Sequence, residues 1–168
     1  MDLIDDVLDF NLKVVYCGTA LGNVSFERMA YYANPSNKFW RTLYAVGLTP
    51  QQLKPADYRK LLQYRQGLTD IVKSNFGLDS QLAKEDYDHV LLRNKMLHYQ
   101  PAILCFNSKN AAKKYLGKTD VSYGFQEEQI NKTRLYVAPS TSGAANGFWD
   151  ESVWRELSDY YNAELRNG

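Results

Sequence analysis

The sequence predicts an α/β protein, a three-layer α/β/α sandwich built around a short, mainly parallel central sheet. Three short apolar runs are predicted to be buried strands, at residues 13–17, 102–106 and 134–137. None of them alternates strictly between apolar and polar residues, which is typical of parallel strands covered on both faces. Helical patterns lie between and around these strands, at residues 37–46, 56–64, 84–98, 109–116 and 151–164. Strands that alternate with helices favour right-handed crossovers and helices on both faces of the sheet.

The composition is that of one ordinary globular domain. With 168 residues, of which 45% are hydrophobic and 23% charged, we expect a single domain over residues 1–168. The net charge of +1 gives no bulk basic character, but a local basic patch is enough to grip a few phosphates, so DNA is not excluded. Cys17 and Cys105 lie in apolar runs, and two cysteines cannot supply the four ligands of an iron–sulfur cluster. The acidic N-terminus has no signal-peptide pattern, and no apolar run reaches membrane-spanning length.

The first predicted strand ends in a glycine-bounded turn. Residues 14–16 form its buried run, the run stops at Gly18, and Gly22 follows four residues later. Glycines directly after a buried strand allow a ligand to approach the backbone closely. We therefore expect ligand contact at the end of this strand.

An aromatic pair, Tyr31 and Tyr32, precedes the first predicted helix. Asn34 can cap that helix, and Pro35 suits its first turn. Aromatic rings bind other flat rings, and helix N-termini bind anions. The loops after the first and third strands leave the carboxyl ends of parallel strands, where ligands bind in open α/β sheets. These observations place the expected site at that edge of the sheet.

Three motifs then point to a family. Residues 18–22 (GTALG), 32–40 (YANPSNKFW) and 137–143 (VAPSTSG) resemble, in this order, motifs of the mismatch-specific uracil and thymine DNA glycosylases of the uracil-DNA glycosylase superfamily. Ala20 stands where that group has the asparagine thought to position the attacking water, and an alanine methyl can neither orient nor deprotonate water. In this respect the chain is more similar to the hypoxanthine-DNA glycosylase subgroup, which is thought to rely on another asparagine. Asn37 is the candidate for that asparagine here.

The resemblance implies a base pocket around the first two motifs. Tyr32 would be the platform on which the flipped base stacks, with a buried core tyrosine as the alternative. Backbone groups of Gly18, Thr19, Ala20 and Tyr32 would bind the edge of the base. Asn37 has two interpretations that the sequence leaves open: its amide orients the water that attacks the sugar, or it supports the cap of the following helix.

The third motif implies a loop that enters the duplex. Ser140 occupies a position at which relatives contact the base or the sugar, so it joins Asn37 as a catalytic candidate. The bulky wedge residue of relatives falls on the small Ala144, and Phe148 either replaces it or packs beside Trp149. The residues of this loop that the resemblance assigns to DNA binding are Thr141, Ser142, Gly143, Ala144 and Asn146.

Two further positions are candidates. Ser108 can cap the helix predicted over residues 109–116, and the start of that helix, with Lys109, can hold a phosphate. Asp70 has three interpretations: a base, a group that stabilises a cation, or a helix-capping acid. The residue types alone do not decide among the three.

We expect a monofunctional DNA glycosylase of base-excision repair that flips a deaminated base, uracil first and hypoxanthine next, and hydrolyses its N-glycosidic bond. The alternatives are a lesion-binding or abasic-DNA-binding module that cleaves little, and a nucleoside hydrolase with the same pocket. No metal or organic cofactor is implied. Damaged DNA is the expected partner of a monomer without membrane association. The expected location is intracellular, in the cytoplasm of a bacterium or archaeon or the nucleus of a eukaryote.

Overall fold

A five-stranded sheet forms the centre of the molecule in a computed structural model that describes residues 2–167, with side chains through residue 163. The strand order is β2-β1-β3-β5-β4. The first four of these strands run parallel, and β4 pairs antiparallel with β5. Their bounds are β1 Val14–Gly18, β2 Gln66–Asp70, β3 Ile103–Phe106, β4 Gly124–Ile130 and β5 Thr133–Val137.

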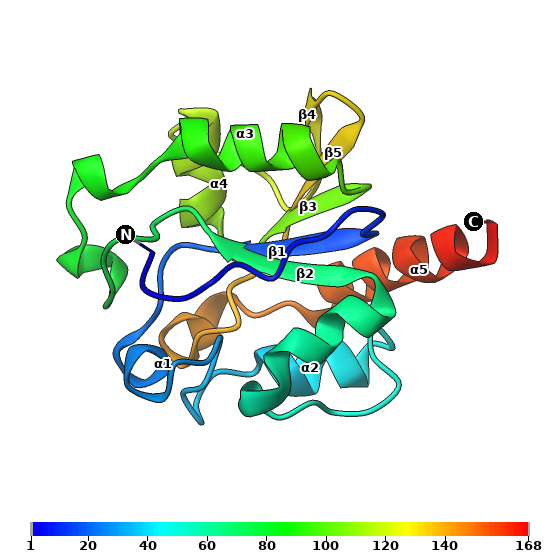
Figure 1. Ribbon diagram of the computed structural model, residues 1–168, viewed down its shortest axis with the longest axis horizontal. Coiled ribbons are helices and arrows are strands. Elements are labelled where there is room, and N and C mark those ends of the chain that lie inside the picture. Colours follow the sequence, from blue (N-terminus) through cyan, green and yellow to red (C-terminus); the bar gives the residue numbers. More distant parts are fainter. Residues whose placement is uncertain (1, 168) are drawn as a thin grey trace.

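Helices cover both faces of the sheet, so the predicted three-layer α/β/α sandwich is confirmed (Figure 1). One face carries α3 (His89–Tyr99) and α4 (Lys109–Leu116). The other carries α1 (Asn23–Arg28), α2 (Phe39–Ala45), the 3-10 helix η1 (Pro55–Tyr64) and α5 (Glu151–Asn167). Short 3-10 helices η2 (Asp79–Gln81), η3 (Lys84–Asp86) and η4 (Gly143–Phe148) lie in the connecting loops. Across residues 2–167, no helix is both long and apolar enough to cross a membrane.

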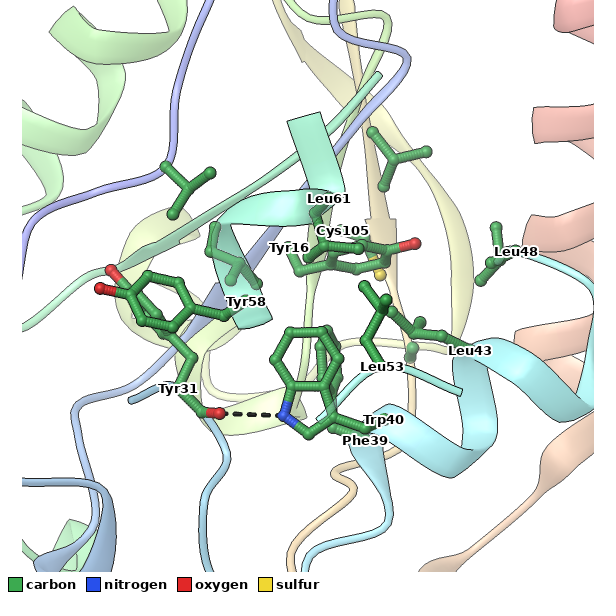
Figure 2. Close-up of a cluster of buried hydrophobic side chains, with 14 of the residues drawn as sticks. Tyr16, Tyr31, Phe39, Trp40, Leu43, Leu48, Leu53, Tyr58, Leu61 and Cys105 are labelled. Atoms are coloured by element: carbon green, nitrogen blue, oxygen red, sulfur yellow. Dashed lines mark hydrogen bonds between the residues drawn. The ribbon is translucent and has the colours of Figure 1, made fainter. Parts of the chain in front are cut away.

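The core on the α2 side is built from aromatic rings (Figure 2). The Tyr16 ring meets the Phe39 ring edge to face at a centroid distance of 5.2 Å. The buried Tyr16 hydroxyl donates to Gln66 Oε1 (2.8 Å), and Gln66 Nε2 donates to the Leu48 carbonyl (2.7 Å). These bonds satisfy polar groups that would otherwise be costly to bury, each by about 1–3 kcal/mol. The core therefore holds β1 and β2 together beneath α2.

The strand β2 was not predicted, because its sequence QGLTD contains a glycine and three polar residues. Every one of its residues is nevertheless buried. Its polar side chains have partners: Gln66 bonds Tyr16 and Leu48, and Thr69 Oγ1 donates to Asp6 Oδ1 (2.7 Å). The unpredicted β4 is an edge strand with exposed polar residues and a register shift between Phe125 and Gln129. Hydrophobic patterns therefore found only the three apolar strands.

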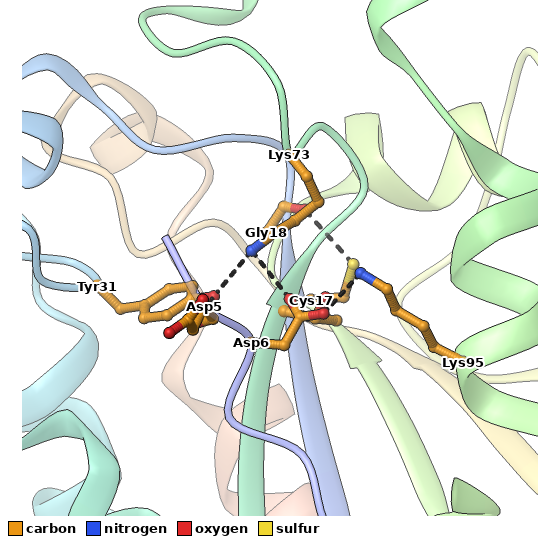
Figure 3. Close-up of polar contacts among 8 residues, drawn as sticks. Asp5, Asp6, Cys17, Gly18, Tyr31, Lys73 and Lys95 are labelled. Carbon is orange, nitrogen blue, oxygen red and sulfur yellow. Dashed lines mark hydrogen bonds and ion pairs between the residues drawn. The ribbon is translucent and has the colours of Figure 1, made fainter. Parts of the chain in front are cut away.

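An N-terminal strap, residues 3–7, lies along the outer side of β2. Val7 forms an antiparallel bridge with Leu68, donating to and accepting from its backbone at 2.8 Å. Gly67 leaves space for this contact, because a Cβ atom there would clash with the Val7 carbonyl oxygen. Asp6 of the strap pairs with Lys73 and Lys95 (Figure 3). The strap is thus fixed to the sheet by backbone bonds and by ion pairs.

Two predicted helix starts were wrong. The helix expected from Asn34 and Pro35 begins only at Phe39, because Asn34 Oδ1 accepts from the Ser36 N–H (2.9 Å) and holds a turn instead. The helix expected over residues 84–98 is split into η3 and α3, and Asp88 caps α3 by accepting from the Leu91 N–H (2.9 Å). These side chains compete with helical hydrogen bonds and move the boundaries.

Candidate active site

A cavity of about 960 Å³ lies at the carboxyl ends of four strands. It is lined by the last residues of β1 and β2 and by the loops that follow β1, β3 and β5. Residues of all three sequence motifs therefore meet at one cavity, at the edge expected for open parallel sheets. Ligand sites typically enclose about 300–1,000 Å³, so the volume is sufficient for a nucleotide base and its sugar.

The cavity brings together most of the predicted site residues. Those that line it are Gly18, Thr19, Ala20, Tyr32, Asn37, Ser108, Lys109, Ser140, Thr141, Ser142, Gly143 and Ala144. Asn146 lies in η4 with an exposed side chain, outside the lining. The candidate Asp70 also lines it, as does Asn107, which the sequence did not assign to the pocket.

Tyr32 forms an aromatic wall of the cavity. One face of its ring stacks on Phe39 at a centroid distance of 4.0 Å and an interplanar angle of 26°. Its backbone is left-handed (φ +54°), and neighbouring bonds hold this segment: Trp40 Nε1 donates to the Tyr31 carbonyl (3.0 Å), and the Ala33 N–H donates to Ser25 Oγ (3.0 Å). Because Phe39 covers one face, a flat ligand can stack only on the other face.

The floor of the cavity is formed where β1 and β2 end side by side. Gly18 is the register partner of Asp70. A Cβ atom on Gly18 would lie 2.6 Å from Asp70 Oδ1 and 2.9 Å from the Tyr32 hydroxyl oxygen. Real Cβ atoms do not approach other atoms so closely, so any side chain at position 18 would displace Asp70 or Tyr32. The helix-cap interpretation of Asp70 was wrong, because Asp70 ends a strand.

Asn37 lies between Tyr32 and α2 in the sequence, lines the cavity and is half-buried. Its Oδ1 accepts from the Phe39 N–H at 3.0 Å, so it does support the start of α2. An amide oxygen can accept a second hydrogen bond, and the amide nitrogen can donate two. The cap contact therefore leaves Asn37 with capacity for a ligand in the cavity.

A side-chain clamp joins the loops after β3 and β5. Asn107 Nδ2 donates to Thr141 Oγ1 (2.9 Å), and the Thr141 N–H donates to Asn107 Oδ1 (3.1 Å). The Thr141 carbonyl accepts from the Lys38 N–H (2.9 Å), which ties the same point to the start of α2. Thr141 is fully buried, so its hydroxyl contacts Asn107 rather than the surface. Sequence reasoning missed Asn107, although its place directly after an apolar strand was the available signal.

The rim of the cavity carries polar and aromatic groups. Ser108 caps α4 as predicted, with Oγ accepting from the Ala111 N–H (3.0 Å). Lys109 Nζ lies 4.4 Å from the centroid of the Tyr123 ring. Phe148 is 77% exposed, so the interpretation that it packs beside Trp149 was wrong.

The pocket lies at the carboxyl edge of a parallel sheet, and an aromatic ring, backbone amides and hydroxyl groups form its walls. An α/β protein with such a pocket is suited to binding a base. The chain belongs to the uracil DNA glycosylase superfamily, whose sequence profile matches residues 6–158. This match confirms the resemblance that the motifs predicted. Members of the superfamily are DNA glycosylases, so DNA is the substrate class.

A solved structure supports the same assignment. The solution NMR structure of a presumptive uracil DNA glycosylase from Methanosarcina acetivorans is similar to this chain with a TM-score of 0.64. The two sequences are 25% identical, and the similarity covers 95% of this chain and 96% of the other. The likeness therefore extends over the whole fold and not only over the motifs.

Proposed function

We propose that this protein flips a deaminated base out of DNA, with uracil the first candidate and hypoxanthine the second, and hydrolyses its N-glycosidic bond to leave an abasic site. One observation carries the proposal: a single cavity brings together the Tyr32 ring, the backbone after β1 and the hydroxyl-rich loop after β5. The ring suits the flat face of a base, the backbone suits the polar edge of the base, and the hydroxyl groups suit its sugar. Enzymes that act on a base extrude it into such a pocket.

The flipped base would stack on the face of Tyr32 that Phe39 leaves free. Base–aromatic stacking contributes about 1–3 kcal/mol. Backbone groups of Thr19, Ala20 and Tyr32 would bind the polar edge of the base, because main-chain donors and acceptors distinguish carbonyl from amino groups without any particular side chain. Gly18 allows this approach, since its Cα bears no side chain.

The reaction would proceed through an oxocarbenium-like sugar, as in other glycoside cleavage. Asn37 would orient the attacking water toward the anomeric carbon, using the hydrogen-bonding capacity that its contact with Phe39 leaves free. Ser140 Oγ accepts from the Ser142 N–H (3.2 Å), so its own proton remains available for the sugar or the base. The rim, with the half-buried Lys109 and Ser142 and the exposed Ala144, would contact the DNA backbone.

A second candidate is a lesion-binding module with little turnover. Ala20 favours it, because its methyl group lines the cavity at the place where relatives have a water-orienting asparagine. Such a module would bind damaged DNA with the same pocket and release no base. The two candidates therefore differ in product and not in binding.

A panel of labelled oligonucleotides tests the proposal. Single uracil, hypoxanthine, xanthine or thymine residues would be placed opposite each base, and also in single strands. We expect alkali-labile sites at uracil or hypoxanthine, none in undamaged duplex, and no strand cleavage before alkali, since water is the nucleophile. Binding without release of any base would instead support the lesion-binding module.

Phe148 is expected to act as the wedge that opens the duplex. Its 77% exposed ring lies at the cavity rim, and Ala144 is too small for this role. Phe148→Ala should lower excision from duplex DNA by roughly tenfold, because a stacked wedge contributes about 1–3 kcal/mol, and should leave single-stranded DNA almost unaffected. Phe10→Ala is the matched control, since Phe10 is also exposed (54%) but precedes β1 at the opposite edge of the sheet. An equal loss on both kinds of DNA would assign Phe148 another role.

A further inference from the structure

Asp70 is a buried acid at the floor of the active-site cavity. It is 5% exposed, it ends β2, and its Oδ1 lies beside the Cα of Gly18. Across residues 2–163, no lysine or arginine forms an ion pair with it: the nearby Lys73 pairs with Asp6 at 2.9 Å and donates to the Tyr31 hydroxyl at 3.1 Å (Figure 3). A buried carboxyl group without a paired cation favours its neutral form.

The groups that face Asp70 come from every neighbouring element. Burial has the largest effect and raises its pKa; Lys73 lowers the pKa, Asp6 of the strap raises it, and both the Gly18 backbone hydrogen bond and Lys95 of α3 lower it. Together, these opposing effects raise the pKa of Asp70 to about 7. Its other titratable neighbours stay neutral, because burial raises the pKa values of Cys17, Tyr31 and Tyr32.

A neutral carboxyl group can do what a carboxylate cannot. It donates a hydrogen bond through its O–H, whereas the ionised form only accepts. When the glycosidic bond breaks, its electron pair moves into the base, and negative charge collects on the carbonyl oxygens of uracil or hypoxanthine. A donor aimed at such an oxygen stabilises the transition state, while a carboxylate would repel it.

We propose that Asp70 faces the extruded base as a neutral carboxylic acid and donates a hydrogen bond to one of its carbonyl oxygens. This inference rests on the proposed function and adds a specificity-determining and catalytic residue to it. No proton has to be transferred, since the bond only strengthens as charge develops on the base. Deprotonation of Asp70 removes the donor, so excision should weaken as the pH rises through about 7.

Single-turnover excision from about pH 5.5 to about pH 8.5 tests the inference. We expect the wild-type rate constant to fall with rising pH with a midpoint near 7. Asp70→Asn keeps a neutral donor, so it should retain the low-pH rate within about threefold and lose the decline. Asp70→Ala should be slower by about tenfold or more at low pH. Asp159→Asn, an exposed acid of α5, is the matched control and should follow the wild-type profile.

Two outcomes would overturn the inference. If Asp70→Ala excises at the wild-type rate at every pH, then Asp70 does not contact the base. If excision instead rises with pH and Asp70→Asn is inactive, then Asp70 works as a carboxylate. A wild-type protein that releases no base contradicts the proposed function. In that case, affinity for duplex DNA with a non-hydrolysable 2′-fluoro nucleotide tests Asp70, and equal, pH-independent affinities of wild type and Asp70→Ala would refute the inference.

Thermal unfolding without DNA tests the charge state separately. A raised pKa in the folded state means that the unfolded chain releases its proton first, so the wild type should lose stability as the pH rises from about 4 to about 7. Asp70→Asn should lack this part of the pH dependence and gain stability relative to wild type above about pH 7. Parallel curves for the two proteins would show that Asp70 is ionised throughout. The same scans identify any variant that does not fold.

Discussion

Asn37→Ala is expected to abolish most excision while leaving duplex affinity close to that of the wild type. The physical reason is that Asn37 lines the same cavity as Tyr32 and, beyond its contact with Phe39, has hydrogen-bonding capacity left to orient water. Loss of correct placement of a reacting group costs about 10²-fold in rate, so we expect a loss of about two orders of magnitude. Phosphate contacts supply most of the non-specific affinity and remain intact. Single-turnover excision and duplex binding by the same variant provide the measurement.

Asp88→Ala is the matched control for this prediction. Asp88 also accepts a bond at a helix start, from the Leu91 N–H to Oδ1 at 2.9 Å, and it does not line the cavity, so its loss shows the cost of a cap contact alone. A purely structural Asn37 would lower stability by about 1 kcal/mol and change the rate little, as expected for a capping residue. Normal excision with lowered stability would therefore assign Asn37 to structure and leave the water-orienting group to be found.

Gly18→Ala is expected to destroy the pocket, although it removes none of the polar groups that line it. The new methyl group would lie 2.6 Å from Asp70 Oδ1 and 2.9 Å from the Tyr32 hydroxyl, so both side chains must move. Overpacking of this kind costs about 1–3 kcal/mol of stability. Because catalysis depends on placement within a fraction of an ångström, we expect excision to fall by about 10²-fold or more. Thermal unfolding and single-turnover kinetics measure the two effects.

Gly22→Ala provides the comparison within the same turn. A Cβ atom on Gly22 would meet nothing within 4 Å, and its backbone (φ −73°) suits any residue. We expect this variant to be close to wild type in both stability and excision. Similar losses for the two alanine variants would mean that the turn tolerates no side chain for a reason other than space at Gly18.

Much of the sheet could be predicted, because β1, β3 and β5 are continuous apolar runs. The strand β2 could not, since Gln66, Thr69 and Asp70 are buried only because Tyr16, the strap and the neighbouring strand surround them. Those partners are far from β2 in the sequence, so no local sequence pattern can reveal them. The start of α2 was missed for a related reason, as Asn34 makes a turn with its own neighbours instead of capping a helix.

The sequence predicted the site residues that belong to a motif. It did not predict the residues that reach the cavity because neighbouring strands end side by side. Tyr32 and Ser140 were found from their motifs and line the cavity. Asn107 and Asp70 line the same cavity, but their place follows from the pairing of β3 and β2 with β1. Strand order is set by long-range packing, so the residue types alone left Asp70 with three interpretations.

The strap has a consequence for how this protein behaves in concentrated solution. Its bridge from Val7 to Leu68 occupies backbone groups of β2 that would otherwise be open to the strand of another molecule. At the far margin of the sheet, β4 presents Glu127, Glu128 and an irregular register, which discourage pairing in the same way. Both margins therefore resist sheet-to-sheet aggregation.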